Sequence, residues 1–117
     1  MARCDRVEDT FIPLTPAVLH ILLSLADQDR HGLGVMSEVE ARTDGKVKLG
    51  PGTLYGTIKR MVSSGLIVES DERPDPDDDD TRRRYYTMTP LGRRVLRMEA
   101  ERLQQVVSAA RDKKVLG

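Results

Sequence analysis

Apolar residues recur at helical spacing along most of the chain, and residues that start or stop helices bound each stretch. Thr15-Pro16 predicts a helix start, because threonine caps a first turn and proline suits the first helical position. The helix that follows is apolar on nearly every side as far as Ala26, which is typical of a central, buried helix. A second, shorter helix is predicted from His31-Gly32 to about Arg42.

The third predicted helix begins at Pro51 and stops at Gly65. On a helical wheel its apolar residues form one stripe, expected to face the core: Leu54, Ile58, Met61 and Val62. The opposite face is small, hydroxylated or basic, and consists of Gly52, Thr53, Gly56, Lys59, Arg60 and Ser63. The whole helix lacks acidic residues.

Two further segments, residues 66–73 and 84–89, are predicted to be antiparallel strands, and the loop between them, residues 74–83, is long for a hairpin. Residues 46–49 alternate polar and apolar side chains, which predicts another short strand. Thr89-Pro90 repeats the helix start, and the fourth helix is predicted to reach about Lys113. Its apolar residues are spaced 4, 3, 4, 3 in a heptad stripe: Leu96, Ala100, Leu103, Val107 and Ala110.

This order of elements predicts a mainly α fold with a small β-hairpin: a winged helix-turn-helix with an added long C-terminal helix. We expect a DNA-binding domain over residues 12–89, a dimerisation helix over residues 90–113 and a mobile N-terminal tail over residues 1–11. A helix of about 24 residues extends about 36 Å, more than a three-helix body covers. Its apolar stripe is therefore expected to pack against a second copy in a two-fold dimer, joined by residues of the first helix.

The 117-residue chain has a formal net charge of zero, but its charges are segregated. Residues 46–64 hold four basic groups and no acids, residues 82–94 hold five basic groups and no acids, and residues 65–81 hold eight acids. The second helix of a helix-turn-helix lies in the DNA major groove, where small, hydroxylated and cationic residues suit bases and phosphates. The third helix alone would also fit a solvated basic face. The wing arginines Arg82, Arg83 and Arg84 favour DNA.

The stretches LTPAVLHILLSL, HGLGVMSEVE, LGPGTLYGTIKRMVSSGLI and DDTRRRYYTMTPLGRRVL resemble the PadR family of bacterial transcriptional regulators. The resemblance covers residues 12–110. It implies a winged helix-turn-helix that dimerises through its C-terminal helix and binds operator DNA as a homodimer, usually to repress, with relief by a small effector. By position it implies DNA contacts at Thr53, Tyr55, Lys59 and Arg82 to Arg84. The helical wheel adds Gly56 and Arg60 to this set.

Some PadR relatives bind flat aromatic drugs between tryptophans, and this chain has no Trp. That mode of ligand binding is therefore not expected here. A small apolar effector, if one binds, is expected at the dimer interface between the first and fourth helices, where apolar residues converge around the symmetry axis. Binding there would change the spacing of the two third helices.

The remaining chemistry predicts no enzyme, no cofactor and no metal site. The sequence has no P-loop, nucleophile elbow or Cys-His pair, and Cys4, His20 and His31 lack partners at ligand spacing. Residues 77–80 are all Asp but lack the glycine and distal glutamate of a calcium loop. Their charge either keeps the wing off non-cognate DNA or pairs with the wing arginines. Strand alternation directs one of Tyr85 and Tyr86 inward, and the other is open to wing packing or a phosphate contact.

The longest apolar stretch, residues 17–26, is too short to span a bilayer, and residues 1–10 lack the apolar segment of a signal peptide. We therefore expect a cytoplasmic protein with no membrane partner. Two other readings of the winged helix stay open: a protein-interaction module, and a dimeric sensor without DNA binding. A steep fall of affinity with salt would distinguish DNA binding from a protein interface.

Overall fold

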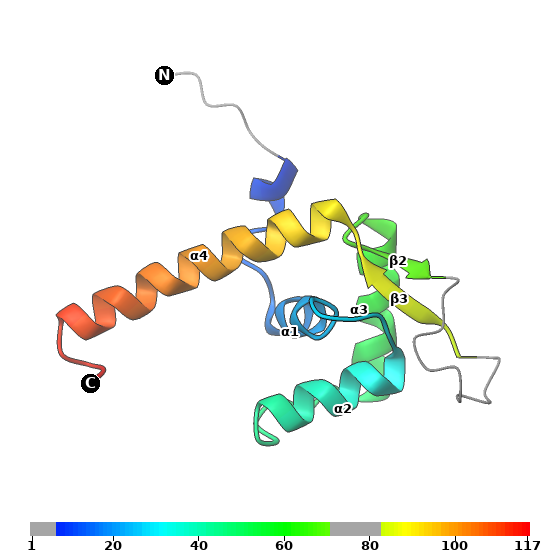
Figure 1. Cartoon of the computed structure of the whole chain (residues 1–117), viewed down its shortest axis with the longest axis horizontal. Helices are drawn as coiled ribbons and strands as arrows, with labels where there is room; N and C mark the ends of the chain where they lie inside the picture. The colour runs from blue at the N-terminus through cyan, green and yellow to red at the C-terminus, as the bar shows by residue number, and fades with distance from the viewer. Residues whose placement is uncertain (1–6, 71–82) are drawn as a thin grey trace.

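The computed structural model describes residues 7–70 and 83–117. The first three α-helices pack against one another with a small antiparallel sheet beside them, and a fourth helix leaves this body as an arm (Figure 1). The predicted winged helix-turn-helix with a long C-terminal helix is thus confirmed. In chain order the elements are the 3-10 helix η1 (Val7–Phe11), α1 (Pro16–Ser24), β1 (Arg30–His31), α2 (Gly32–Arg42), α3 (Pro51–Ser63), β2 (Ile67–Ser70), β3 (Tyr85–Met88) and α4 (Pro90–Asp112).

The two Thr-Pro pairs start helices as the sequence predicts. The Thr15 hydroxyl accepts a hydrogen bond from the backbone N–H of Val18 at 3.3 Å, and the Thr89 hydroxyl accepts one from that of Gly92 at 3.0 Å. The Thr89 hydroxyl also donates to the carbonyl oxygen of Gly65 at 2.6 Å, just after α3. Gly65 has a φ of +84°, the left-handed conformation that a helix stop requires.

The sheet differs from the predicted hairpin because it has a third strand, with the order β1-β3-β2. The prediction of a strand at residues 46–49 is wrong, since this segment is an irregular loop that buries Leu49. The extra strand is β1, between the first two helices, where the sequence analysis predicts no strand. It pairs Arg30 with Tyr86 and His31 with Tyr85. A two-residue strand has no periodicity of its own and forms because β3 offers a free edge.

The core lies between α1, α2, α3 and the start of α4, with the α1 residues Ile21 and Leu22 fully buried. The predicted stripe of α3 is buried at three of its four positions, Leu54, Ile58 and Met61. Val62 is 39% exposed, so its predicted burial is wrong, and Thr57 is buried instead. Val62 is exposed because it lines an open groove between α3 and the wing.

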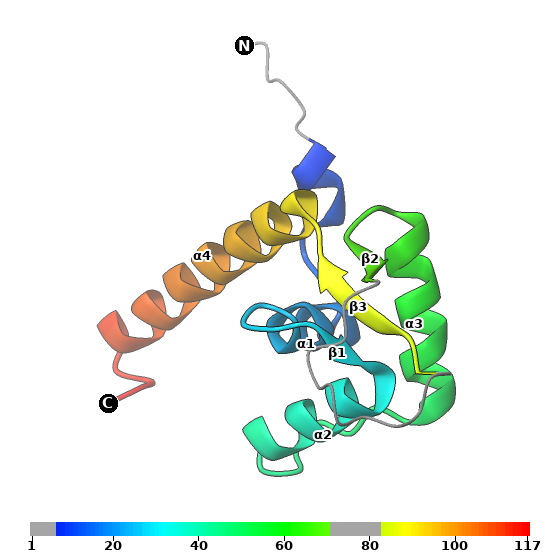
Figure 2. The ribbon, with the colours of Figure 1, turned by 45° about the vertical axis from the view of Figure 1, so that its right-hand side comes forward.

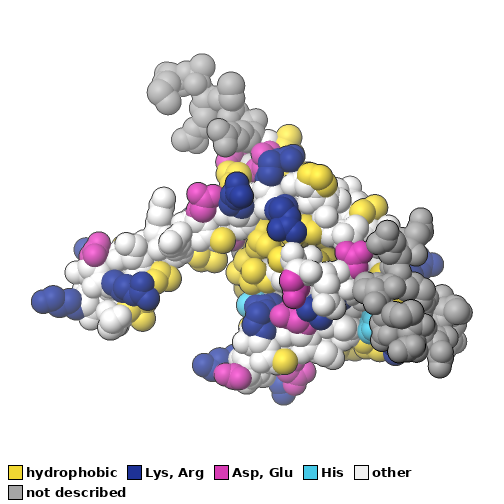
Figure 3. Space-filling view, in the orientation of Figure 1, with side chains coloured by type: hydrophobic (Ala, Val, Ile, Leu, Met, Phe, Trp, Pro, Cys, Tyr) yellow, Lys and Arg dark blue, Asp and Glu magenta, His cyan; other side chains and the backbone are white. Residues whose placement is uncertain are grey.

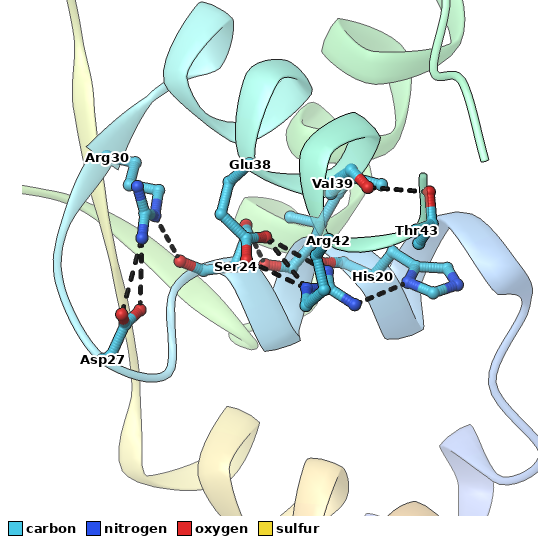
Figure 4. A network of polar contacts seen from close by, with 9 residues as sticks. His20, Ser24, Asp27, Arg30, Glu38, Val39, Arg42 and Thr43 are labelled. Atoms are coloured by element: carbon cyan, nitrogen blue, oxygen red, sulfur yellow. Dashed lines mark hydrogen bonds and ion pairs between the residues drawn. The ribbon is translucent and has the colours of Figure 1, made fainter. Parts of the chain in front are cut away.

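Polar contacts hold α1 and α2 together (Figure 4). The Arg42 guanidinium donates to the Glu38 carboxylate at 2.9 Å and to the backbone carbonyl of His20 at 3.3 Å, and it lies 3.2 Å from His20 Nδ1. Burial and the neighbouring Arg42 charge lower the pKa of His20 below its usual value, although Glu38 opposes this. Arg30 donates to the carbonyl of Ser24 at 2.7 Å, which ties the C-terminal end of α1 to β1.

The first half of α4 is anchored to the body, partly by residues that the sequence assigned to the tail. Of residues 1–11, residues 7–11 form η1, which packs on α4 and pairs Glu8 with Arg94 at 3.3 Å. The buried carboxylate of Glu99 accepts the backbone N–H of Leu14 at 2.7 Å and pairs with Arg102. In the part of the chain that the structure describes, no residue of α4 beyond Glu99 is buried.

Candidate nucleic-acid interface

The outward face of α3 lies beside the strands of the wing (Figure 2). It is exposed at most of the residues that the sequence predicts at DNA, namely Thr53, Tyr55, Lys59 and Arg60, and Gly56 is half-buried. Arg83 and Arg84 are exposed at the start of β3, whereas Arg82, Cys4 and the acidic residues 77–80 lie outside the described residues. The structure therefore places α3 and two of the three predicted wing arginines on neighbouring elements.

Two glycines on this face are not required by the packing of the chain itself. A Cβ atom at Gly52 would meet no described atom within 4 Å, and one at Gly56 would have Arg60 Nη1 as its nearest neighbour, at 3.6 Å. The Arg60 guanidinium bends back to donate to the Thr57 hydroxyl at 3.1 Å. The missing side chains leave a surface on which the backbone of α3 can approach another molecule closely.

Tyr55 stands between two hollows of the surface. Its ring packs on Gly32, where a Cβ would come within 2.6 Å of Tyr55 Cε1, and its side chain remains 47% exposed. The α2-side recess, of about 340 Å³, is lined by His31, Gly32, Leu33, Tyr55, Arg83, Arg84 and Tyr86. The α3–wing groove, of about 350 Å³, is lined by Tyr55, Ile58, Lys59, Val62, Ser63, Glu69, Arg84 and Tyr86.

The predicted alternation of the two wing tyrosines is confirmed. Tyr85 points inward and is 5% exposed, with its ring edge-on to His31 at a centroid distance of 5.2 Å. Tyr86 points outward into both hollows. Burial and the nearby carboxylate of Glu69 raise the pKa of Tyr86, and Arg84 partly offsets this.

Sequence reasoning missed Glu69 and His31 at this surface. Glu69 belongs to the acidic stretch before the wing loop, and its neighbours in sequence give no sign that it faces α3. The sequence places His31 at the start of the second helix, without partners at ligand spacing, and does not place it at this surface. Its Nδ1 accepts the backbone N–H of Gly34 at 3.1 Å and so caps α2, while its ring lines the α2-side recess. The His-Gly pair at the start of α2 is the sequence feature that indicates the capping role of His31.

The sequence profile of the transcriptional regulator PadR-like family matches residues 19–98, which include most of α1, all of α2 and α3, and the start of α4. The chain belongs to this family. Its members regulate transcription by binding DNA and are not enzymes.

Individual relatives of this PadR-like chain agree with the match. Transcriptional regulator Rv3488 of Mycobacterium tuberculosis is 35% identical over 88 residues, which cover 75% of this chain and 76% of that protein. An uncharacterized 37.1 kDa protein in transposon TN4556 of Streptomyces fradiae is 31% identical over 90 residues, but these cover only 24% of that protein.

Solved structures share the fold. A transcriptional regulator from Clostridium thermocellum superposes with a TM-score of 0.67 at 21% identity and covers 95% of this chain and 97% of its own. A PadR family transcription regulator from Clostridium difficile R20291 gives the same TM-score and identity over 84% of this chain and 97% of its own. Within residues 7–70 and 83–117, no helix is long and apolar enough to cross a membrane.

The heptad stripe of the PadR-like chain divides into two parts. Leu96 is 8% exposed and packs in the core. The other four residues lie on the projecting arm, where Ala100 and Val107 are exposed and Leu103 and Ala110 are half-buried. Figure 3 shows hydrophobic side chains on the side of the arm that faces the hollow between arm and body.

Proposed function

We propose that this PadR-like regulator binds operator DNA sequence-specifically as a two-fold homodimer, represses transcription and is released by a small apolar effector. The observation that carries the proposal is the exposed face of α3. It is free of carboxylates, opened by two glycines without packing partners, and adjacent to Arg83 and Arg84. A helix with such a face can enter the major groove without electrostatic repulsion from the phosphates.

The residues of this face have different roles in the proposed complex. Thr53, Tyr55 and Gly56 lie near the N-terminal end of α3, which approaches base edges in a helix-turn-helix. We assign Arg60 to the bases as well, whereas Lys59 and the wing arginines are cations suited to phosphates. The α2-side recess supports the wing contact, since its polar lining consists of donors to phosphate: two arginines, two tyrosine hydroxyls and a histidine.

The arm supports the proposal of a dimer. About 13 residues of α4 follow Glu99, a length of about 20 Å that carries apolar side chains beyond the reach of its own core. A second copy related by two-fold symmetry would cover them and would place two α3 helices on half-sites about 10 base pairs apart. We propose the effector site in the same interface, between α1 and α4, where a bound molecule changes the spacing of the two α3 helices.

The test begins with purified protein and fragmented genomic DNA. Sequencing the retained fragments should give a pseudo-palindromic site, and a reporter gene behind this site should be less active when the protein is present. Affinity for the site should fall steeply with salt. A shallow salt dependence together with capture of a partner protein would support the protein-interaction module, and a dimer that retains no DNA would support the sensor.

A further inference from the structure

The α3–wing groove contains a carboxylate, although the exposed face of α3 contains none. Glu69 on β2 lines this groove together with Lys59 and Arg84, and it is the one carboxylate among the described residues that do so. It lies opposite Tyr86 in the β2–β3 pairing. An acidic side chain therefore occupies a surface whose other polar groups suit phosphate.

Glu69 is placed so that it holds one particular wing arginine. Its Oε2 lies 3.6 Å from Arg84 Nη1, and the two side chains are 50% and 69% exposed. Arg83, the preceding residue, lines the α2-side recess instead, with its Nη1 3.5 Å from His31 Nε2. A long, exposed ion pair contributes little to stability, so another anion can replace Glu69 at Arg84.

A DNA phosphate that enters the groove meets the same carboxylate. Glu69 also raises the pKa of the neighbouring Tyr86 hydroxyl, after burial, which places its negative charge within range of a further phosphate donor. An ionised carboxylate is an acceptor only and cannot bond a phosphate oxygen. A phosphate that contacts Arg84 therefore either displaces Glu69 or shares the guanidinium with it, and in both cases it lies close to the negative charge of Glu69.

We propose that Glu69 competes with DNA phosphate for Arg84 and thereby lowers the affinity of this protein for DNA of any sequence. The inference rests on the proposed function, because it requires DNA on the face formed by α3 and the wing. Binding to random DNA consists almost entirely of phosphate contacts. The competing carboxylate thus weakens random binding and makes the complex depend more on base contacts.

The test is the variant Glu69→Gln, which keeps the size of the side chain and removes its charge. Its binding to a random-sequence duplex of about 30 base pairs, long enough for two half-sites, is followed by fluorescence anisotropy at several salt concentrations. We expect binding about tenfold tighter at low salt, and a logarithmic salt slope steeper by about one unit per subunit. Glu40→Gln, an exposed residue in the last turn of α2, makes the same change in net charge and should alter affinity less than about twofold.

A double-mutant cycle shows whether Glu69 acts through Arg84. In an Arg84→Ala background, the change Glu69→Gln should no longer tighten binding. The proposal is overturned if Glu69→Gln leaves affinity and slope unchanged, if Glu40→Gln gives an equal gain, or if the full gain persists without Arg84. A wild-type protein that binds no DNA at low salt refutes the proposed function and this inference together. A wild-type protein that binds DNA, with Glu69→Gln unaltered, refutes the inference alone.

Discussion

Helices α3 and α4 both begin with proline at the first turn and both carry an apolar stripe, yet the stripes and the opposite faces are used differently. The core buries most of the α3 stripe, so the surface of α3 that stays exposed is its outward face, which has no carboxylates. On α4 the apolar stripe itself stays exposed over the arm, because no described residue of the helix after Glu99 is buried. The difference matches the two parts of the proposed function, in which α3 contacts DNA and the arm of α4 contacts a second copy of the chain.

The largest effect is expected from a charge in the stripe of the arm. In Leu103→Glu, each copy would lose about 1.5–3 kcal/mol of apolar burial, so the dissociation constant of the dimer should rise about 100-fold or more. Sedimentation at micromolar concentration measures this. Gln105→Glu puts the same charge on the opposite side of the arm and should leave the dimer intact. A wild-type protein that is monomeric throughout would contradict the role given to α4.

The glycines of the two helices should respond in opposite ways. At Gly92, at the start of α4, a Cβ would overlap the carbonyl oxygen of Leu66 and press on Met88, so we expect Gly92→Ala to lower the free energy of unfolding by about 3 kcal/mol. Gly52→Ala on α3 meets open space and should raise it by about 0.5–1 kcal/mol. Urea unfolding of both variants measures the difference. Equal effects would mean that the two glycines serve the same purpose.

Filling the surface of α3 should harm DNA binding without harming the fold. A leucine at position 56 projects from the outward face, where it blocks close approach to the major groove, so we expect Gly56→Leu to bind its operator at least about tenfold more weakly. Binding titration and urea unfolding are measured on the same preparation. Wild-type affinity in a folded Gly56→Leu protein would show that α3 is not the DNA surface.

Removing one wing cation should have a smaller and more uniform effect. Arg83→Ala should weaken binding to all sequences alike and lower the logarithmic salt slope by about one unit per subunit, hence about two per dimer. Arg111→Ala removes the same charge from the last turn of α4 and serves as the matched control. Loss of affinity for the operator alone would assign Arg83 to a base contact instead.

The smallest effect concerns the contacts between α1 and α2. The pKa of His20 is lowered in the folded protein, so folding favours its neutral form. Its contribution to stability is therefore fully present above the ordinary pKa of 6.5 and is lost as the pH falls below that value towards the folded pKa. Urea unfolding should show a smaller loss of stability between about pH 7.5 and pH 5.5 in His20→Gln than in the wild type. An identical loss in both would exclude His20 as the group responsible.

The elements that could be predicted from sequence are those specified by their own residues. Both Thr-Pro helix starts and the stop at Gly65 depend on local backbone chemistry, and they are found where the sequence places them. Strand β1 depends on pairing with β3, far along the chain, and residues 7–11 form η1 because α4 lies beside them. The residues of β1 and η1 alone do not indicate either contact.

The candidate site was predicted to a similar extent. The helical wheel identified the exposed face of α3 because helical periodicity alone separates it from the core. The wheel placed Val62 on the wrong side, since it contains no information about how much of α3 the sheet covers. It also could not show that Glu69 faces Arg84, because this contact arises from the register of two strands.

Through its hydroxyl, Thr89 connects the C-terminal end of α3 to the start of α4. It accepts the N–H of Gly92 at the start of α4 and donates to the carbonyl of Gly65 at the end of α3, while its backbone N–H donates to the carbonyl of Leu66. Gly92 also packs closely against the backbone of Leu66, so the start of α4 is fixed to the segment that follows α3. A change in the angle between the arms of a dimer would therefore turn both α3 helices by mechanical linkage, without any ligand touching them.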